Sequence, residues 1–375
     1  AATTPGPGCA FVFIRSGSSW QLQATLTVDV IKTDGTNTRF GSAVAIDATG
    51  TRIAVGAPEA TELYGSEGHV QIFLRTGTTW ARETKIVPPV NENSTVMESY
   101  IDFGQALSFN AAGDVLAIGA PRGNGLVSPG LVEDDSGFVY MCRRSGTTWT
   151  IEKRLRAPNF LSNDNFGHSV CLDAAGVQLV ATCQNRDYSS YVDVGSILIY
   201  NYAASDWTVA AELFPPDVVN VMNFGAGSYI GGSSIKISGD GNVVVAGARV
   251  SPGNGNGSGA ALIFVKSGAV WNYVQKLDET AANSTYFGLS VAINNTGSKI
   301  LVGSYAQAST GVANLYKKSG SAWTKTNTLA PSKNIAGEQY GRTVTMCNNG
   351  DYGAVSAINE SATGASLGAC YTVSL

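Results

Sequence analysis

One unit recurs six times along this chain of 375 residues, and it constrains the fold more than any other feature. In the first copies, an aromatic residue followed by glycine is paired with a later Gly-Ala-Pro triplet. The first pair is Phe40-Gly41 with Gly56-Ala57-Pro58. The copies begin near residues 40, 103, 166, 231, 287 and 340. Repetition at such a period indicates that similar supersecondary units stack on one another.

The first half of the unit has the pattern of two antiparallel strands. Apolar residues alternate in the first strand, as in Val44 and Ile46, and this period of two indicates one buried face. The return strand, such as Ile53-Ala54-Val55, is continuously apolar, so we expect both of its faces to be buried. A glycine-containing turn joins the two strands, as at Ala48-Thr49-Gly50.

The second half of the unit adds two more strands. A small residue opens an alternating strand, a basic-Ser/Thr-Gly turn follows, and a tryptophan begins the next strand, as in Gly68–Gly77 with Trp80. A single four-stranded unit cannot bury both of its faces, but units arranged around an axis can. Because helical patterns are nearly absent, the sequence predicts an all-β fold, a β-propeller of four-stranded antiparallel blades.

The strand count favours six blades, with seven as the alternative. Strands expected in residues 9–26 and 369–374 give one strand more than six blades need. We expect residues 9–375 to form a single propeller whose N-terminal strands, 9–26, close the ring, and residues 1–8 to form an extended Pro/Thr/Gly arm. Residues 9–15 and 369–374 compete for one blade position. The surplus strand makes either a five-stranded blade or a strand donated to a second protomer.

The paired motifs resemble the FG-GAP repeat that builds the β-propeller of integrin α-subunits. Phe103-Gly104 with Gly119-Ala120-Pro121 matches this repeat in the second copy. The sequence is more similar to secreted FG-GAP proteins whose units carry an Arg-Ser-Gly-x-x-Trp turn, as in Arg144-Ser145-Gly146 with Trp149. The resemblance covers about residues 8–375. It implies a secreted or surface propeller, in a family of adhesion receptors, surface proteins and some hydrolase-associated domains.

The turns within the repeats differ from the calcium loops that integrin-like blades often carry. The corresponding segments are Asp47–Gly50, Asn110–Gly113, Asp173–Gly176, Gly239–Asn242 and Asn294–Gly297. None of them offers the several spaced oxygen ligands that calcium requires. We therefore expect no metal site and no cofactor, and we expect these Asp and Asn side chains to bond their own turn backbone.

Catalytic patterns are weak, so the sequence predicts a protein that is not an enzyme. The two histidines, His69 and His168, are expected to be ordinary surface or blade-edge residues. Gly364–Gly368 matches G-x-S-x-G, but no Asp or His follows it. The acidic run Glu133-Asp134-Asp135 fits a solvated loop better than a site for a cation or a basic partner.

Charge and hydropathy exclude two classes of partner. The net charge is −4, so no basic surplus favours a nucleic-acid backbone. No apolar run reaches the roughly 20 residues of a membrane-spanning helix. Residue 1 is Ala and not Met, which fits a processed chain or a fragment.

Sequons and cysteines suggest an extracellular, secreted or surface location. N-glycosylation is expected at five N-x-S/T sites: Asn93, Asn256, Asn283, Asn294 and Asn359. Thr3 and Thr4 are candidates for O-glycosylation. Cys9 and Cys370 lie at the starts of the competing terminal strands, which makes them a candidate disulfide pair.

These observations lead to two functional expectations, with a propeller hydrolase as a third hypothesis. The first is an extracellular non-enzymatic structural protein, a glycosylated self-assembling surface or filament subunit joined through its terminal strands as a homo-oligomer or polymer. The alternative is an adhesion or ligand-binding propeller that recognises a protein or a carbohydrate through the loops on one face.

Overall fold

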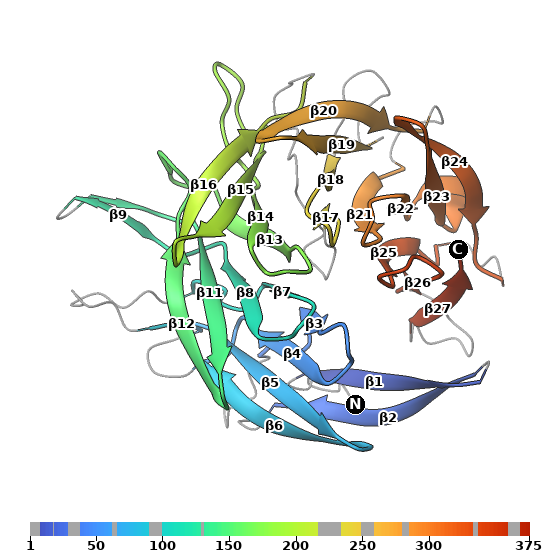
Figure 1. The fold of residues 1–375 in the computed structure, drawn as a ribbon, viewed down its shortest axis with the longest axis horizontal. Coiled ribbons are helices and arrows are strands. Elements are labelled where there is room, and N and C mark those ends of the chain that lie inside the picture. Colours follow the sequence, from blue (N-terminus) through green and yellow to red (C-terminus); the bar gives the residue numbers. More distant parts are fainter. Residues whose placement is uncertain are drawn as a thin grey trace. The chain divides into compact units, whose positions relative to one another are not determined.

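The computed structural model describes residues 8–17, 19–28, 38–61, 66–89, 100–128, 131–216, 234–248, 259–279, 285–332, 337–358 and 368–375. These residues form 27 β-strands and one three-residue 3-10 turn, Gln307–Ser309 (Figure 1). No helix in these segments has the length and apolarity needed to cross a membrane.

The described segments of the N-terminal unit, residues 1–168, contain two four-stranded antiparallel blades. The first blade consists of β3 (Val44–Ile46), β4 (Arg52–Ala57), β5 (His69–Thr76) and β6 (Thr79–Ile86). The second consists of β7 (Ala106–Phe109), β8 (Val115–Ala120), β11 (Phe138–Ser145) and β12 (Thr148–Leu155). Two further hairpins are β1 (Cys9–Ser16) with β2 (Ser19–Thr27), and β9 (Gly125–Ser128) with β10 (Leu131–Glu133).

The C-terminal unit, residues 169–375, continues the series from β13, which starts just before the boundary. The third blade consists of β13 (Phe166–Leu172), β14 (Gln178–Cys183), β15 (Ser196–Ala203) and β16 (Asp206–Leu213). The fourth consists of β17 (Ile235–Ile237), β18 (Val243–Ala248), β19 (Ala260–Ser267) and β20 (Val270–Leu277). The fifth consists of β21 (Phe287–Ile293), β22 (Lys299–Ser304), β23 (Val312–Ser319) and β24 (Ala322–Leu329). The sixth consists of β25 (Tyr340–Met346), β26 (Tyr352–Ala357) and β27 (Ala369–Ser374).

The predicted fold class is confirmed: the chain is an all-β, six-bladed propeller with four-stranded antiparallel blades and almost no helix. Two details differ from a uniform set of blades. The sixth sheet has three strands, and its third position is taken by β27, while β1 and β2 form a two-stranded sheet of their own. Ring closure by residues 9–26 and the single domain over residues 9–375 stay predictions. Of the predicted arm, residues 1–7 lie outside the described residues.

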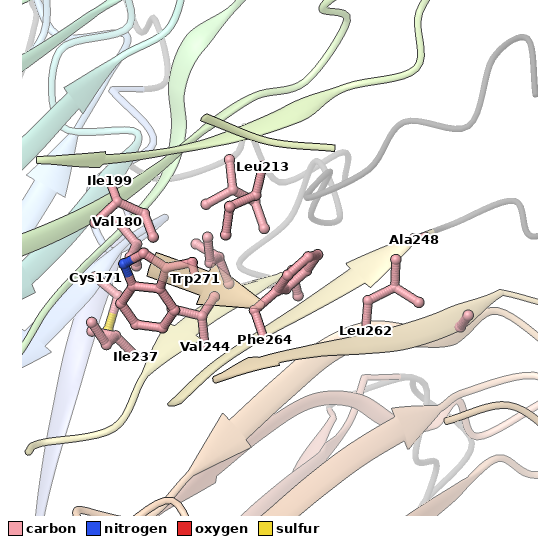
Figure 2. Close-up of a cluster of buried hydrophobic side chains, with 14 residues drawn as sticks. Cys171, Val180, Ile199, Leu213, Ile237, Val244, Ala248, Leu262, Phe264 and Trp271 are labelled. Atoms are coloured by element: carbon pink, nitrogen blue, oxygen red, sulfur yellow. The ribbon is translucent and has the colours of Figure 1, made fainter. Parts of the chain in front are cut away.

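The hydrophobic core lies between consecutive blades. In the C-terminal unit, Val180 and Ile199 of the third blade pack with Val244, Phe264 and Trp271 of the fourth (Figure 2). Complete burial of side chains of this size contributes about 1.5–3 kcal/mol each. The inner return strands are buried on both faces, as their continuous apolar runs predicted.

A side chain closes the turn between the first two strands of each blade. The Oδ1 atom of Asp47 accepts a hydrogen bond from the Thr51 N–H at 2.7 Å, and Asn294 Oδ1 accepts one from the Lys299 N–H at 2.9 Å. The equivalent acceptors in the other blades are Asn110, Asp173, Ser238 and Cys347. The prediction that the Asp and Asn side chains of these turns bond their own backbone is therefore confirmed for Asp47, Asn110, Asp173 and Asn294.

Glycine is required where consecutive blades touch through their backbones. A Cβ atom on Gly56, in β4 of the first blade, would overlap the carbonyl oxygen of Gly104, which follows Phe103 in the second blade. The same overlap recurs between three other pairs, Gly119 with Gly167, Gly247 with Gly288 and Gly303 with Gly341. The two repeated motifs are thus the two sides of one contact between blades.

The N-terminal hairpin presents an uncovered apolar face. Phe73, the fifth residue of β5, is 6% exposed, whereas Phe13, the fifth residue of β1, is 53% exposed. Register places Leu22 opposite Phe13 and Trp20 opposite Arg15, so Trp20, Leu22, Phe13 and Phe11 share one face of the hairpin. All four apolar side chains are exposed.

Replacing Gly56 with Ala should destabilise the protein by about 3 kcal/mol, the upper end for overpacking, because the new methyl group meets backbone atoms. Gly77→Ala is the matched control. Unlike Gly56, Gly77 has a positive φ, +63°, but nothing lies within 4 Å of the added Cβ, so only about 1 kcal/mol of backbone strain is expected. Urea unfolding measures both variants. Equal losses would show that the contact between blades is not tight.

Phe73→Ala should cost about 3–5 kcal/mol, because it leaves a cavity in a buried cluster. Phe13→Ala, at the corresponding position of the exposed hairpin face, should cost less than about 1 kcal/mol. Thermal and urea unfolding of the two variants would test this difference. A loss for Phe13→Ala as large as that for Phe73→Ala would mean that the hairpin face is covered in solution.

Candidate functional site

In five blades the described residues include a strained turn at the start of the first strand. We call it the FG turn, and we call the residue before its aromatic residue the lead residue. The carbonyl oxygen of the lead residue accepts a hydrogen bond from the N–H three residues later, as from Gln105 to Asp102 at 3.0 Å. The glycine in the third position has a positive φ, +96° at Gly104, which is typical of a type II turn.

The five lead residues that lie in the described segments also have positive φ angles, although none of these five is glycine. Their φ angles are 53° at Arg39, 57° at Asp102, 51° at Asn165, 51° at Tyr286 and 56° at Gln339. Such a conformation costs a side-chain-bearing residue about 1–3 kcal/mol and is often found at functional positions. The aromatic residue and the glycine are repeated, whereas the lead side chain differs from turn to turn. The lead positions are therefore candidates for function.

In the N-terminal unit, the lead residue Asp102 forms an ion pair with Arg122. Arg122 Nε lies 3.4 Å from Asp102 Oδ2, and the Arg122 N–H donates to the Ile101 carbonyl oxygen at 3.3 Å. The guanidinium side chain is 52% exposed and the carboxylate side chain is 20% exposed. An external molecule can therefore reach Arg122 while Asp102 stays largely sheltered from water.

The environment of Asp102 makes its carboxylate a usable base. Burial raises the pKa of Asp102 to about 6, although Arg122 opposes part of this rise. The charge of Glu59 raises this pKa further, and the charge of Arg39 lowers it. The group is mostly ionised at pH 7 and still has appreciable proton affinity, which suits general acid-base work near neutral pH.

Other charged groups surround this pair. Arg39, the lead residue of the first blade, forms an ion pair with Glu59 at 3.1 Å. Burial raises the pKa of Asp135, which Arg122 partly offsets. Asn165 Nδ2 donates to the Asp135 carbonyl oxygen at 3.2 Å, which ties the third-blade turn to this loop. The acidic run at residues 133–135 thus contributes Asp135 to the site, and Asp134 is exposed.

In the C-terminal unit, aromatic and polar side chains occupy the equivalent turns. The rings of Tyr286 and Tyr305 stack with centroids 4.8 Å apart, and Arg342 lies 5.0 Å from the Tyr305 centroid. Arg342 Nη1 also donates to Gln339 Oε1 at 3.1 Å.

Most of the predicted modification sites lie outside the described residues: Thr3, Thr4, Asn93, Asn256, Asn283 and Asn359. Asn294 is described and buried, and its Nδ2 donates to Thr296 and Ser298 at 3.3 and 3.0 Å. A glycan on this nitrogen requires the turn to open, so the geometry disfavours glycosylation at Asn294. Cys9 and Cys370 carry free thiols and lie in different units, and their bonding stays a prediction.

His168 lies on β13, an edge strand of the third blade, as expected, whereas His69 is not a surface residue. His69 is the first residue of β5, and it is buried because the first five residues of this strand are buried. Its Nε2 lies 3.1 Å from Gln71 Nε2. Burial lowers the pKa of His168 to about 4, so the ring is neutral at pH 7. Within the described segments, no group of three or more His, Cys, Asp or Glu side chains could hold a metal ion.

Sequence reasoning missed the lead residues. Asp102, Arg122 and Arg342 belong to no known catalytic motif, and their significance depends on which loops the blades bring together. One signal was available in the sequence: the residue before each aromatic-glycine pair varies while the pair itself is kept.

No family model matches the chain, and no curated protein matches it either. Solved structures do. A periplasmic gluconolactonase of Pseudomonas aeruginosa is 14% identical with a TM-score of 0.53, and the match covers 97% of this chain and 92% of that one. A candidate 6-phosphogluconolactonase of Bacteroides fragilis is 10% identical with a TM-score of 0.57, over 99% and 92% of the two chains. A chain of a mitotic checkpoint complex is 12% identical with a TM-score of 0.54, over 93% and 80%.

At this low identity, the similarities show the β-propeller fold and do not show membership of the FG-GAP family. They overturn the functional prediction. The expected non-enzymatic structural, self-assembling filament subunit is wrong, and so is the expectation that the protein is not an enzyme, because the neighbours over nearly the whole chain include gluconolactonase-type enzymes. The prediction failed because it relied on catalytic motifs, and propeller sites are assembled from separate loops.

The stability of the Asp102→Asn variant, measured relative to wild type, should increase as the pH rises. The folded-state pKa of Asp102 is raised, so ionisation between about pH 4 and pH 6 opposes folding, and asparagine cannot ionise. The stability difference between variant and wild type should grow by about 1–3 kcal/mol from pH 4 to pH 7 in urea unfolding. Asp351→Asn, at a side chain 59% exposed, is the control. A difference that does not change with pH would contradict the burial of Asp102.

Proposed function

We propose that this protein is a hydrolase that opens the ring of a sugar lactone, with Asp102 and Arg122 as its reacting pair. The observation that carries the proposal is their geometry: a sheltered carboxylate on a strained turn, 3.4 Å from an exposed guanidinium. The gluconolactonase and candidate 6-phosphogluconolactonases among the similar propellers support the substrate class.

The proposed reaction needs one base and one oxyanion partner. The Asp102 carboxylate takes a proton from water while the water oxygen attacks the carbonyl carbon of the lactone. The electron pair of the carbonyl π bond moves to its oxygen, and the Arg122 guanidinium stabilises the resulting oxyanion. As the oxyanion collapses, the ring C–O bond breaks. The ring oxygen then takes the proton from Asp102, which yields a hydroxy acid and restores the carboxylate.

The surrounding charges suit a polar or anionic sugar derivative. Arg39 is 40% exposed beside Glu59, and its charge acts on Asp102, so a second guanidinium is accessible to a substrate of the reacting pair. A guanidinium can donate two parallel hydrogen bonds to a carboxylate or a phosphate. We therefore place a phosphorylated lactone alongside the neutral one as a candidate substrate.

The finer sequence-based expectations remain part of this proposal. The proposed relationship of this chain to the FG-GAP family is supported by the paired glycine contacts between blades. Extracellular, secreted or surface location is supported by the sequons in the sequence. We propose a glycan or protein as ligand and a second copy of the chain as partner. The exposed apolar face of the N-terminal hairpin supports a contact with another molecule.

Hydrolysis of D-glucono-1,5-lactone and of its 6-phosphate should exceed the spontaneous rate in a pH-indicator assay. Because the base must be ionised, kcat/KM should rise through about pH 6 and level off above it. Asp102→Asn should lower kcat by about 100-fold or more, since general base catalysis contributes roughly 10²–10⁴-fold. Arg122→Gln should lower kcat by a similar factor.

The control is Asp351→Asn, an exposed carboxylate in a turn of the sixth blade, which should leave both rates unchanged. Turnover no faster than the spontaneous rate with either lactone would refute the proposed activity. Full activity in Asp102→Asn would refute the assignment of the base.

A further inference from the structure

We propose that Tyr286, Tyr305 and Arg342 form a platform in the C-terminal unit that binds the ring of a carbohydrate. This inference concerns a second site and does not rest on the proposed hydrolysis. It starts from three segments that the fifth and sixth blades bring together: the lead residue Tyr286, the loop after β22 that carries Tyr305, and the FG turn from Gln339 to Arg342.

The two tyrosines are arranged as a nearly parallel stack. Their planes differ by 12° and their centroids lie 4.8 Å apart. Their hydroxyl groups also interact, and a hydrogen bond from Arg342 to Tyr305 adds to the order of the stack. Burial raises the pKa of Tyr305, so its hydroxyl stays protonated and able to donate near neutral pH.

Arg342 packs against the ring of Tyr305. The guanidinium lies 5.0 Å from the Tyr305 centroid, within the range of a cation–π interaction. Its Nη1 donates to Gln339 Oε1 at 3.1 Å. Rings held in this way lose little conformational freedom when a ligand binds, which favours affinity.

The chemistry of the cluster matches a sugar ring. The four side chains of Tyr286, Tyr305, Gln339 and Arg342 are half-buried, so they are fixed by the fold and still reachable. A pyranose has an apolar C–H face that can lie on an aromatic ring, and a rim of hydroxyl groups that need donors and acceptors. Tyrosine hydroxyl, carboxamide and guanidinium groups supply both at the edge of the stack.

A nearby acceptor also lacks a donor. The carboxamide oxygen of Gln307, on the same loop as Tyr305, is buried and has no hydrogen-bond partner in the described segments. Buried polar atoms are rarely left without a partner, so this oxygen can accept from a hydroxyl donor when the loop opens.

Binding of methyl β-D-glucopyranoside, methyl β-D-galactopyranoside and methyl α-D-mannopyranoside to the full chain would test the platform. Saturation-transfer NMR should show magnetisation passing from tyrosine ring protons to the pyranose C–H protons of at least one of them. D-sorbitol, an open-chain polyol without a ring face, should show none. These glycosides contain no ester, so binding and lactone hydrolysis succeed or fail separately.

Tyr286→Ala should weaken the binding of that pyranoside by roughly tenfold, and Tyr286→Phe, which keeps the ring, should restore most of the affinity. Tyr352→Ala, at an exposed tyrosine of β26, is the matched control and should change nothing. Circular dichroism verifies the fold of each variant. No binding by any of the three pyranosides, equal binding by sorbitol, or unchanged binding in Tyr286→Ala would overturn the proposal.

Discussion

The contact between blades depends on backbone lying against backbone, and only glycine permits it. In both units, a Cβ at the second-strand glycine would overlap the carbonyl oxygen of the glycine in the next FG turn, as at Gly56 and Gly104. The close approach of these two glycine backbones fixes how closely one sheet packs on the next. The buried layers of Val, Ile, Phe and Trp side chains between blades fill the space that remains, so the core follows from the glycine contact.

The same contact between blades explains why the lead residues of the FG turns are the candidate functional positions. Because the aromatic residue of the FG turn is anchored in the core and its glycine faces the preceding blade, the backbone of the turn is fixed on both sides. The lead residue is held at a positive φ as a consequence, and its side chain is the part of the turn that is free to differ. A carboxylate at Asp102 and a phenol at Tyr286 therefore occupy equivalent positions with different chemistry.

Sequence alone predicted the features that depend on local pattern. Alternating and continuous apolar runs predicted the strands, although Val44 and Ile46, expected on a buried face of β3, are exposed. The turn residues Asp47 and Asn294 close their turns as expected. The site was not predictable in this way, because the pKa of Asp102 is raised by burial, and Arg122, which opposes part of that rise, lies on another loop. The non-enzymatic prediction failed for the same reason: it relied on catalytic motifs, and Asp102 and Arg122 belong to none.

The repeated FG turn also makes the site modular. Since each lead side chain stands on an equivalent, independently anchored turn, a mutation at one of them changes the chemistry presented there and leaves the packing between blades intact. Substitutions at Arg39, Asp102 and Asn165 alter what the N-terminal unit presents, and substitutions at Tyr286 and Gln339 alter what the C-terminal unit presents. The same five positions offer a protein engineer a compact library in which new specificities can be sought without rebuilding the scaffold.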